Sequence, residues 1–340
     1  MLKVGIVGGA FAATLHAQGW QKTNRAQIVA MAAPSKATRD SFSKSFNCKA
    51  YESAQEMIAN EKLDVISLTL PNLYHKELTM LAASKGIHVV CEKPLAINLE
   101  DAKQMVQACK SAGVKLLYAE QIIFAPRYEK VKELIDNKSF GQIVHISHRE
   151  RHGGPHAKWF RDKSLSGGGV TMDMAIHGIG LICHLLAPAK PTHIFARIIT
   201  VDKSSPVDDH CLITLEFDNN VLATVDASWV APGGVDDVLE VLGTAGYVRA
   251  DLARGQTLDL YTLVGSNETA EKAETSKGWL KIPHEEARAW GWYAEIEHFA
   301  AVLLDGAKPI TTGEDGLDAL KIVMAAYESA KTHQRIALNL

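Results

Sequence analysis

The chain has 340 residues, of which 47% are apolar and 22% charged, and its 36 basic and 39 acidic side chains give a formal net charge of −3. This length predicts about two domains, and the slightly acidic balance disfavours binding of nucleic acid or an anionic membrane through a basic face. No run of about 18 apolar residues occurs, so we predict no transmembrane helix. The five cysteines are far apart and form no Cys-x-x-Cys pair, which favours free thiols in a reducing, cytoplasmic compartment.

Short apolar runs alternate with helix-like segments through the first third of the chain. The predicted strands are Leu2–Val7, Gln27–Ala32, Leu63–Leu70, Gly86–Cys91 and Lys115–Ala119. The predicted helices are Phe11–Lys22, Ser35–Phe46, Ser53–Ala59, Leu73–Ser84 and Leu99–Ser111. Because the strands are continuously apolar and alternate with helices, they predict a doubly wound parallel sheet that is covered on both faces.

After residue 122 the apolar residues recur with a period of two, which is typical of strands with one buried face. The alternation is clearest over Val221–Trp229, and the turn Asp218-Asn219-Asn220 joins this strand to the preceding one. Further strands are predicted at Gly141–Arg151, Thr192–Val201, Asp237–Gly243, Tyr247–Asp251 and Thr257–Val264. We expect an α+β domain with a large, open, mainly antiparallel sheet over residues 123–340, after a first domain over residues 1–122.

Helices are predicted in this second region around Pro126–Asn137, Gly291–Leu304 and Asp315–Lys331. The last two close the chain, and we expect that they can pack back on the first domain. The stretch Gly265–Lys281 is rich in Ser, Thr, Glu and Lys, which is the composition of a solvated loop.

A glycine-rich turn, Gly5-Ile6-Val7-Gly8-Gly9-Ala10-Phe11-Ala12-Ala13, follows the first predicted strand and opens the first helix. Such a turn brings the backbone and a helix N-terminus close to the pyrophosphate of a dinucleotide. Gly8 supplies the tight turn, and Ala10 and Ala13 stand at the second and third positions of the G-x-G-x-x-G pattern. The turn predicts a dinucleotide site formed by Gly8, Ala10, Phe11 and Ala12; a glycine-rich turn without a ligand is the alternative.

No carboxylate follows the second predicted strand, where it would bind the ribose hydroxyls of adenosine. The sequence at this point is Ala32-Ala33-Pro34-Ser35-Lys36, with Arg39 one turn later. Without a carboxylate there is no repulsion of a 2′-phosphate, and Ser35, Lys36 and Arg39 are able to bind one. We therefore favour NADP, or use of both NAD and NADP. The alternative is that Lys36 and Arg39 are solvated surface charges.

The tetrapeptide Cys91-Glu92-Lys93-Pro94 stands at the end of a predicted strand. Ligands of doubly wound sheets bind at the carboxyl ends of the strands. Pro94 stiffens the turn and would direct Lys93 toward such a ligand. An ordinary surface lysine is the alternative interpretation.

Three glycines, Gly167-Gly168-Gly169, precede a segment in which Asp173 and His177 are four residues apart. On a helix this spacing places both side chains on one face. A carboxylate beside an imidazole orients the ring and stabilises its protonated form, as a general base requires. The alternative is an ion pair on the surface of a helix.

Histidines concentrate between residues 145 and 184, and the loop Arg151-His152-Gly153-Gly154-Pro155-His156 precedes Trp159. We predict a polar substrate loop in which His152 and His156 contact the substrate and Trp159 packs on a sugar ring. A metal site that combines His152, His156 and Asp173 or His177 is the less favoured alternative, because Gly-Gly-Pro prevents a helical pair of ligands.

Taken in order, these motifs resemble the Gfo/Idh/MocA family, which includes glucose–fructose oxidoreductase and inositol 2-dehydrogenase. The resemblance covers almost the whole chain. It rests on Gly5–Ala13 with His16, Pro71-Asn72-Leu73-Tyr74-His75, Glu92-Lys93-Pro94, Trp159, Gly167–Gly169, and Asp173 with His177. It implies an N-terminal Rossmann domain, and a C-terminal domain whose open sheet builds homodimers or homotetramers.

The resemblance also implies hydride transfer between a nicotinamide ring and a secondary alcohol of a sugar, cyclitol or polyol. Lys93 matches the lysine that hydrogen-bonds the reacting hydroxyl, His177 the general base and Asp173 the carboxylate that supports it. Positions that line the dinucleotide are matched by Pro71, Asn72, His75, Glu92 and Gln121, the last near the nicotinamide.

Four positions depart from the family pattern: Ala10, Ala33, Ala175 and Gly180. The first two bear on affinity for the dinucleotide and the last two on the substrate pocket. Two other functions stay open. One is redox-neutral elimination or hydrolysis of a glycosidic bond with a tightly bound dinucleotide, and the other is a non-catalytic sensor of dinucleotide or sugar.

Overall fold

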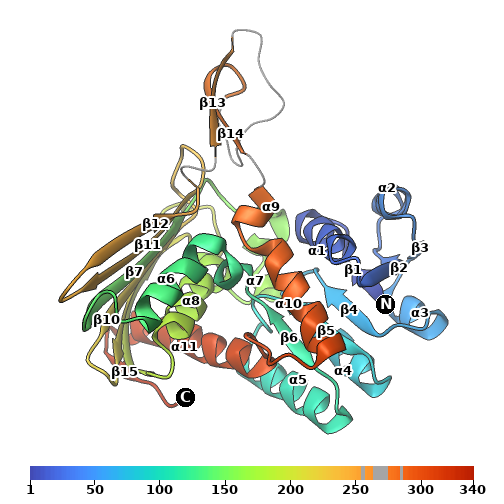
Figure 1. Ribbon diagram of the computed structural model, residues 1–340, viewed down its shortest axis with the longest axis horizontal. Coiled ribbons are helices and arrows are strands. Elements are labelled where there is room, and N and C mark those ends of the chain that lie inside the picture. Colours follow the sequence, from blue (N-terminus) through green and yellow to red (C-terminus); the bar gives the residue numbers. More distant parts are fainter. Residues whose placement is uncertain (254–256, 263–274, 284–285) are drawn as a thin grey trace. The chain divides into compact units, whose positions relative to one another are not determined.

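The computed structural model describes residues 1–253, 257–262, 275–283 and 286–340, which fall into two compact units (Figure 1). The first unit consists of Met1–Gln121 and Gly291–Leu320, and the second of Ile122–Trp290 and Lys321–Leu340.

The first unit is built on a six-stranded parallel sheet with the strand order β3-β2-β1-β4-β5-β6. Its strands are β1 (Leu2–Val7), β2 (Ala26–Ala32), β3 (Lys49–Tyr51), β4 (Val65–Leu68), β5 (His88–Glu92) and β6 (Leu116–Ala119). The order reverses between β1 and β4, which is where doubly wound sheets open a crevice for ligands at the carboxyl ends of their strands. The predicted doubly wound parallel sheet is confirmed, and only the three-residue strand β3 was not foreseen.

Three helices of this unit begin at a capping side chain. The helices of the unit are α1 (Phe11–Lys22), α2 (Lys36–Phe46), α3 (Ala54–Asn60), α4 (His75–Ser84), α5 (Leu99–Ala112), α10 (Trp292–Asp305) and the first part of α11 (Gly313–Thr332). The side chains of Ser35, Ser53 and Asn98 accept main-chain N–H groups at three helix starts. Helix α10 packs against α1, where a Cβ on Gly19 would lie 2.9 Å from Ile296.

The second unit is built on a seven-stranded sheet with the strand order β12-β11-β7-β10-β9-β8-β15. Its strands are β7 (Ile143–Arg151), β8 (Pro191–Ile199), β9 (His210–Phe217), β10 (Leu222–Ser228), β11 (Asp236–Gly243), β12 (Tyr247–Asp251) and β15 (Ile336–Ala337). All neighbouring pairs are antiparallel except β7 and β10, so the predicted mainly antiparallel sheet is confirmed. The helices are α6 (Pro126–Asp136), α7 (Lys163–Ser166), α8 (Ile176–Leu186), α9 (Glu286–Ala289) and the end of α11.

A separate pair of antiparallel strands joins β13 (Thr257–Thr262) to β14 (Gly278–Pro283). The predicted loop Gly265–Lys281 lies mostly outside the described residues. Its end is part of β14, so the loop prediction is wrong there, because pairing with β13 outweighs the polar composition.

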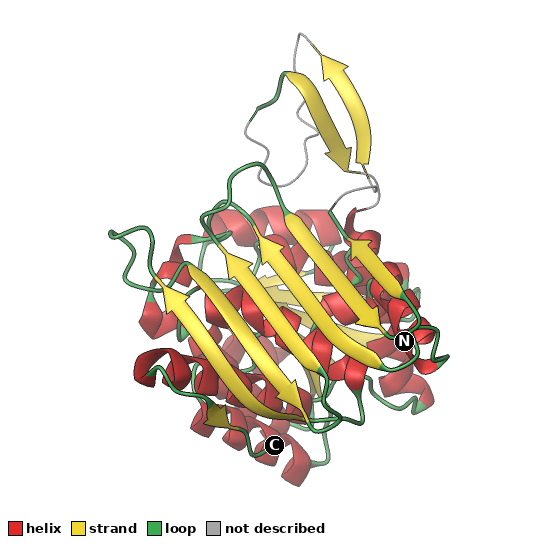
Figure 2. Cartoon of the chain, turned by 90° about the vertical axis from the view of Figure 1, so that its left-hand side faces the viewer, coloured by secondary structure: helices red, strands yellow, loops and turns green. Residues whose placement is uncertain are grey.

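One face of the seven-stranded sheet is buried and the other is open. The buried residues of β10 include Ala223, Val225 and Ala227, as the period of two predicts. Figure 2 looks onto the opposite face, in front of which no described helix lies. This open face exposes large apolar side chains, namely Phe195, Ile199, Leu212, Leu222 and Leu242.

The helical stretch Lys163–Leu186, which ends in α8, has the length and apolar composition of a membrane span. Of its apolar window, 78% is buried inside the protein. Burial of this extent is typical of a core helix, because an apolar helix that packs on a sheet needs the same composition.

Candidate active site

The turn between β1 and α1 has the shape that the glycine pattern predicts. Gly8 adopts a φ of +117°, and a Cβ at this position would lie 2.2 Å from the carbonyl oxygen of Thr69, which follows β4. Helix α1 then begins at Phe11, and Ala10 provides no side-chain cap. The turn therefore needs glycine at position 8, and it leads into a helix start with no capping side chain to compete with an anion for its N–H groups.

In the loop after β2, Arg39 has hydrogen-bond partners that the sequence does not indicate. Its Nη1 donates to the carbonyl oxygens of Ala33 and Pro34, at 2.8 Å each, and its Nη2 donates to Glu52 at 2.8 Å. Arg39 thus braces the loop from within. Lys36 pairs with Asp40 at 2.6 Å, and both side chains are exposed.

The end of β5 is held by two histidines of the first unit. Glu92 Oε1 lies 3.0 Å from His16 Nε2, and Glu92 Oε2 accepts the main-chain N–H of Lys93 at 3.1 Å. The buried ring of His75 lies 3.1 Å from the carbonyl oxygen of Pro94 and 3.0 Å from that of Leu70. These contacts fix the turn that carries Lys93, whose side chain is half-buried.

Other predicted dinucleotide residues lie near the carboxyl ends of the strands. Asn72 is buried and Pro71 half-buried after β4, and Gln121 is buried just beyond β6. Burial lowers the pKa of His75, so its ring is neutral near neutral pH and donates through one nitrogen.

In the second unit, Asp208 fixes the start of the helical segment that carries Asp173 and His177. Its carboxylate accepts the main-chain N–H groups of Gly169 at 3.0 Å and Thr171 at 2.9 Å, and also the Tyr327 hydroxyl at 2.9 Å. The carboxylate therefore satisfies N–H groups that the first turn of a helix leaves free. A Cβ on Gly169 would lie 1.9 Å from the carbonyl oxygen of Asp208, so the approach requires glycine.

Asp173 and His177 are both buried, with exposed fractions of 8% and 4%. Asp173 lies in a π-helical turn, Thr171–Ala175, and His177 in the first turn of α8. Single π-turns inside helices are frequent at functional sites. The burial of both groups disagrees with the alternative of a surface ion pair.

The predicted substrate loop follows β7. His152 is buried and His156 is exposed, and their ring centres lie 5.4 Å apart. Trp159 is half-buried and stacks on Phe160 with ring centres 3.8 Å apart, so one face of its ring is already occupied. Within the described part of the chain, no three His, Cys, Asp or Glu side chains are arranged to hold a metal ion.

Several residues of interest were not singled out from the sequence. Asp208 lies in a loop before β9, and Glu120 and Glu295 are buried carboxyl groups in the first unit. The two glutamates are marked by their burial, and Asp208 by its hydrogen bonds to the main chain of Gly169 and Thr171. A single sequence shows burial of acidic residues poorly, because charged residues are usually exposed.

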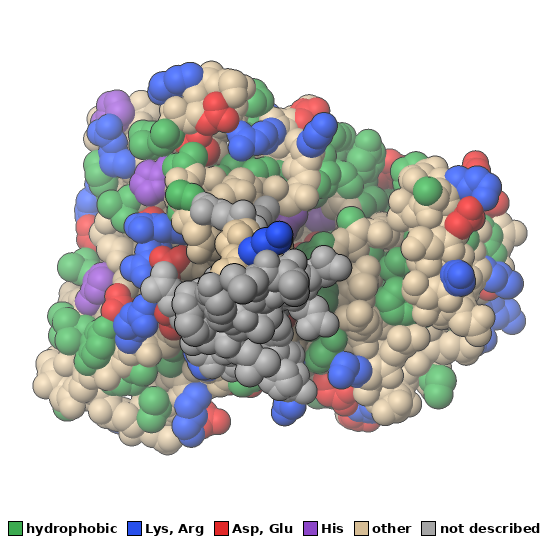
Figure 3. Space-filling view, turned by 90° about the horizontal axis from the view of Figure 1, so that it is seen from above, with side chains coloured by type: hydrophobic (Ala, Val, Ile, Leu, Met, Phe, Trp, Pro, Cys, Tyr) green, Lys and Arg blue, Asp and Glu red, His purple; other side chains and the backbone are tan. Residues whose placement is uncertain are grey.

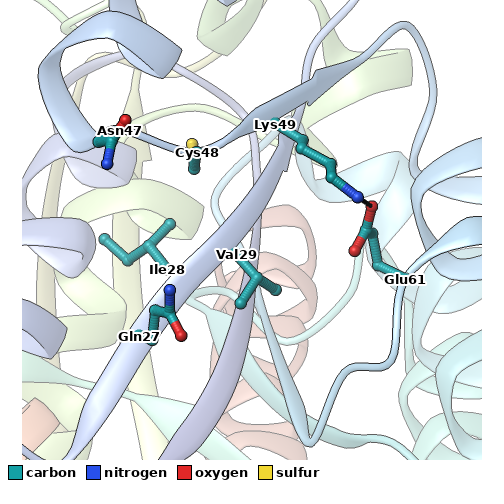
Figure 4. Close-up of a pocket in the computed structure, with 7 residues that line it drawn as sticks. All are labelled: Gln27, Ile28, Val29, Asn47, Cys48, Lys49 and Glu61. Carbon is teal, nitrogen blue, oxygen red and sulfur yellow. Dashed lines mark hydrogen bonds and ion pairs between the residues drawn. The ribbon is translucent and has the colours of Figure 1, made fainter.

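A shallow pocket of about 470 Å³ lies on the first sheet at the amino-terminal ends of two strands, away from the carboxyl ends that carry the candidate residues (Figure 4). It is lined by the amino-terminal parts of β2 and β3, and Lys49 pairs with Glu61 at its side. Because ligands of such sheets bind at the carboxyl ends, this pocket does not match a dinucleotide site. Figure 3 shows basic and acidic side chains interspersed over the coloured part of the upper face.

A family model described as an oxidoreductase family with an NAD-binding Rossmann fold matches residues 2–120, and the GFO/IDH/MocA C-terminal domain model matches residues 128–249. The chain belongs to the Gfo/Idh/MocA oxidoreductase family. The resemblance predicted from the ordered motifs is thereby confirmed, as is the Rossmann fold of the first unit.

The relatives cover nearly the whole chain. The myo-inositol 2-dehydrogenase of Thermotoga maritima is 26% identical over 99% of this chain and 99% of its own length. The NADP-dependent D-xylose 1-dehydrogenase of Haloarcula marismortui is 26% identical over 85% of this chain and 78% of its own. The solved structure of GenD2 from gentamicin A biosynthesis, in complex with NAD, matches with a TM-score of 0.94 and 26% identity over 100% of this chain and 97% of that one.

Proposed function

We propose that this family member transfers hydride between a nicotinamide dinucleotide and a secondary alcohol of a sugar, cyclitol or polyol. The observation that carries the proposal is Lys93, placed by Glu92 at the carboxyl end of β5 in an NAD-binding Rossmann fold. The relatives named for inositol and xylose support this substrate class.

The residues of the first unit fit a dinucleotide. The tight turn at Gly8, where a Cβ would collide with Thr69, and the uncapped start of α1 suit a pyrophosphate. The main chain of Gly8, Ala10, Phe11 and Ala12 would hold it, and Pro71, Asn72, His75, Glu92 and Gln121 would line the nicotinamide half. The bound dinucleotide supplies a hydride acceptor in alcohol oxidation.

The side chains of the site would remove the hydroxyl proton of the alcohol during oxidation. Lys93 donates a hydrogen bond to the reacting hydroxyl, and its positive charge lowers the pKa of that hydroxyl. His177 takes the proton as general base, and the carboxylate of Asp173 stabilises the imidazolium that forms. His152, His156 and the free face of Trp159 bind the remaining hydroxyls and ring of the substrate.

For the choice of dinucleotide, we propose that NADP is used, alone or together with NAD. No carboxylate occupies Ala33-Pro34-Ser35 to repel a 2′-phosphate. Because Arg39 braces the loop, Lys36 is the exposed cation left to contact that phosphate, with Ser35 beside it.

The open face of the seven-stranded sheet supports a homodimer or homotetramer. It exposes Phe195, Leu212 and Leu242 among charged pairs such as Arg151–Asp226, and an interface would cover these large apolar side chains. Light scattering measures the mass of the assembly directly.

The five free cysteines support a cytoplasmic location. We propose the first unit as the dinucleotide domain, and the second as the domain for substrate and assembly.

The test combines binding with turnover. Purified protein is titrated with NADH and with NADPH by fluorescence, and sugars, cyclitols and polyols are then screened for dinucleotide reduction. We expect Lys93→Ala to lower kcat by about two orders of magnitude or more, because it removes the group that activates the hydroxyl. Lys103→Ala, an exposed lysine of the same unit, is the matched control.

Near wild-type turnover of Lys93→Ala would contradict the proposed role. Cleavage of a glycoside without net reduction of the dinucleotide would favour the redox-neutral reaction instead. Dinucleotide binding without any turnover would favour the sensor.

A further inference from the structure

Three glutamates of the first unit are buried near the carboxyl ends of β5 and β6. Glu92 is the last residue of β5, Glu120 follows β6 directly, and Glu295 lies in the first turn of α10. Their exposed fractions are 7%, 0% and 0%. We refer to Glu92, Glu120 and Glu295 as the glutamate cluster.

The members of the cluster have different surroundings. Glu92 lies 3.0 Å from His16 and accepts the main-chain N–H of Lys93 at 3.1 Å, so its negative charge is supported. Neither carboxyl oxygen of Glu295 makes a hydrogen bond of normal geometry with the described residues. The two groups therefore differ sharply in how well each tolerates ionisation.

Three carboxylates cannot all be ionised at close range in a buried setting, because burial and mutual repulsion both penalise the charged form. At Glu295, burial first and then the charges of Glu92 and Glu120 raise the pKa well above its usual range, while the main-chain N–H of Glu120 lowers it slightly. Complete burial without a hydrogen bond of normal geometry to the described residues therefore favours the protonated form of Glu295.

We propose that Glu295 is a positioning residue, which by staying uncharged keeps the Glu92 carboxylate between His16 and the Lys93 N–H and so holds the Lys93 turn in place. The role rests on the proposed function, in which Lys93 and Glu92 contact substrate and dinucleotide. Ionisation of Glu295 would add a third negative charge to the cluster and push the Glu92 carboxylate away from its two donors.

The charged groups that act on Glu295 are Glu92, at the end of β5, and Glu120, directly after β6. Glu92 in turn lies 3.0 Å from His16 on α1 and precedes Lys93 in the chain. The buried Tyr118, on β6, lies near Glu120 and Glu92. Burial and then the charges of Glu120, Cys91, Glu92 and Asp315 raise the pKa of the Tyr118 hydroxyl well above its usual range, so this group stays uncharged. On α10 itself, Glu297 is exposed to solvent and serves as a matched control.

The first experiment measures the Kd for NADH by fluorescence from about pH 6 to about pH 9, for wild type, Glu295→Gln and Glu297→Gln. Glutamine is a neutral mimic of the protonated acid. We expect wild type to lose about tenfold or more in affinity as Glu295 ionises at high pH. Glu295→Gln should keep the low-pH affinity throughout, and Glu297→Gln should follow wild type. A pH profile of Glu295→Gln that matches wild type overturns the proposal.

A second variant tests the electrostatic coupling, and it also serves if Glu295→Gln does not fold. Glu120→Gln removes one neighbouring negative charge, which makes ionisation of Glu295 easier, so the loss of affinity should begin at lower pH. An unchanged starting pH contradicts the proposal.

Unfolding in urea tests the proton on Glu295 without any ligand. Above about pH 4.5 the unfolded chain releases this proton while the folded protein keeps it, so the urea midpoint of wild type should fall relative to that of Glu295→Gln as pH rises. A constant difference overturns the proposal. If no variant binds a dinucleotide at any pH, the proposed function fails and the positioning role fails with it, while the urea series still reports where the proton resides.

Discussion

The two units place their candidate residues in different ways. In the first unit these residues stand where strands end: Gly8 after β1, Glu92 and Lys93 at β5, and Gln121 beyond β6. In the second unit Asp173 and His177 lie on a helical segment whose start is fixed by Asp208, far along the chain. The strand pattern in the local sequence therefore predicts where the first set lies, although distant residues such as His16 hold it in place. The start of the helical segment in the second unit depends on Asp208, which local sequence does not indicate.

We expect the largest effect from a substitution that breaks the close contact between Gly169 and Asp208 in the second unit. Gly169→Ala puts a methyl group 1.9 Å from the carbonyl oxygen of Asp208, a backbone atom that cannot move aside cheaply. We expect a loss of about 3 kcal/mol in the free energy of unfolding, measured in urea, since overpacking against backbone distorts the segment. Turnover should fall as well, because the same segment carries Asp173 and His177.

The matched control is Gly153→Ala. A Cβ at Gly153 would meet its nearest neighbour, the carbonyl oxygen of Ala231, at 3.9 Å, which is an ordinary contact. This variant should unfold like wild type. Equal stability of the two variants would show that Asp208 does not fix the helix start by close approach.

A second prediction concerns the loss of stability in acid. We expect two histidines of the first unit to contribute to this loss, and an exposed histidine of the second unit not to contribute. His88 Nδ1 accepts the Lys115 N–H and His298 Nε2 accepts the Ile310 N–H, each at 3.0 Å, and both belong to the first unit. Burial lowers the pKa of each ring. Protonation would also replace an acceptor by a donor and break these hydrogen bonds.

The sign follows from proton uptake. Below about pH 6.5 the unfolded chain binds protons that the folded first unit does not bind, so stability falls as pH decreases through this window, by at most about 1.4 kcal/mol per pH unit for each group. His88→Asn and His298→Gln keep an acceptor without titrating, and should each flatten the dependence of the urea midpoint on pH. His333→Asn, at an exposed histidine of the second unit, should leave the slope unchanged. An equal slope in all variants would contradict the prediction.

The same contrast explains which features the sequence predicts well. Strand and helix patterns identify five of the six strands of the first sheet, because continuous apolar runs and caps such as Ser53 and Asn98 act locally. Strand β3 is not predicted, because two of its three residues are exposed and so short a strand carries no apolar pattern. Glu295 is not predicted because an acidic residue in a sequence gives no sign of whether folding will bury it. Asp208 is not predicted because its main-chain partners, Gly169 and Thr171, lie far from it in the sequence.

Arg39 shows a subtler limit of the same kind. Its place in α2, one turn after Lys36, predicts a phosphate ligand, and in the structure its guanidinium donates to two carbonyl oxygens of the preceding loop and to Glu52. A planar guanidinium with five donors serves either purpose, so residue type and spacing do not distinguish them. Only the positions of the acceptors do.

We expect the smallest effect from a substitution after β2. It tests whether residue type and spacing alone predict the side chain that binds the 2′-phosphate. Lys36→Ala removes an exposed cation that pairs with Asp40. We expect the Kd for NADPH to rise about fivefold, which is about 1 kcal/mol, and the Kd for NADH to stay unchanged, because only NADPH carries the 2′-phosphate. Lys44→Ala, an exposed lysine on the same helix, is the control. A different result would be that Lys36→Ala weakens the binding of neither dinucleotide while Arg39→Ala weakens the binding of NADPH alone. In that case Arg39 leaves its carbonyl partners to bind the 2′-phosphate. The site after β2 would then depend, like the helical segment of the second unit, on a contact that the local sequence does not show.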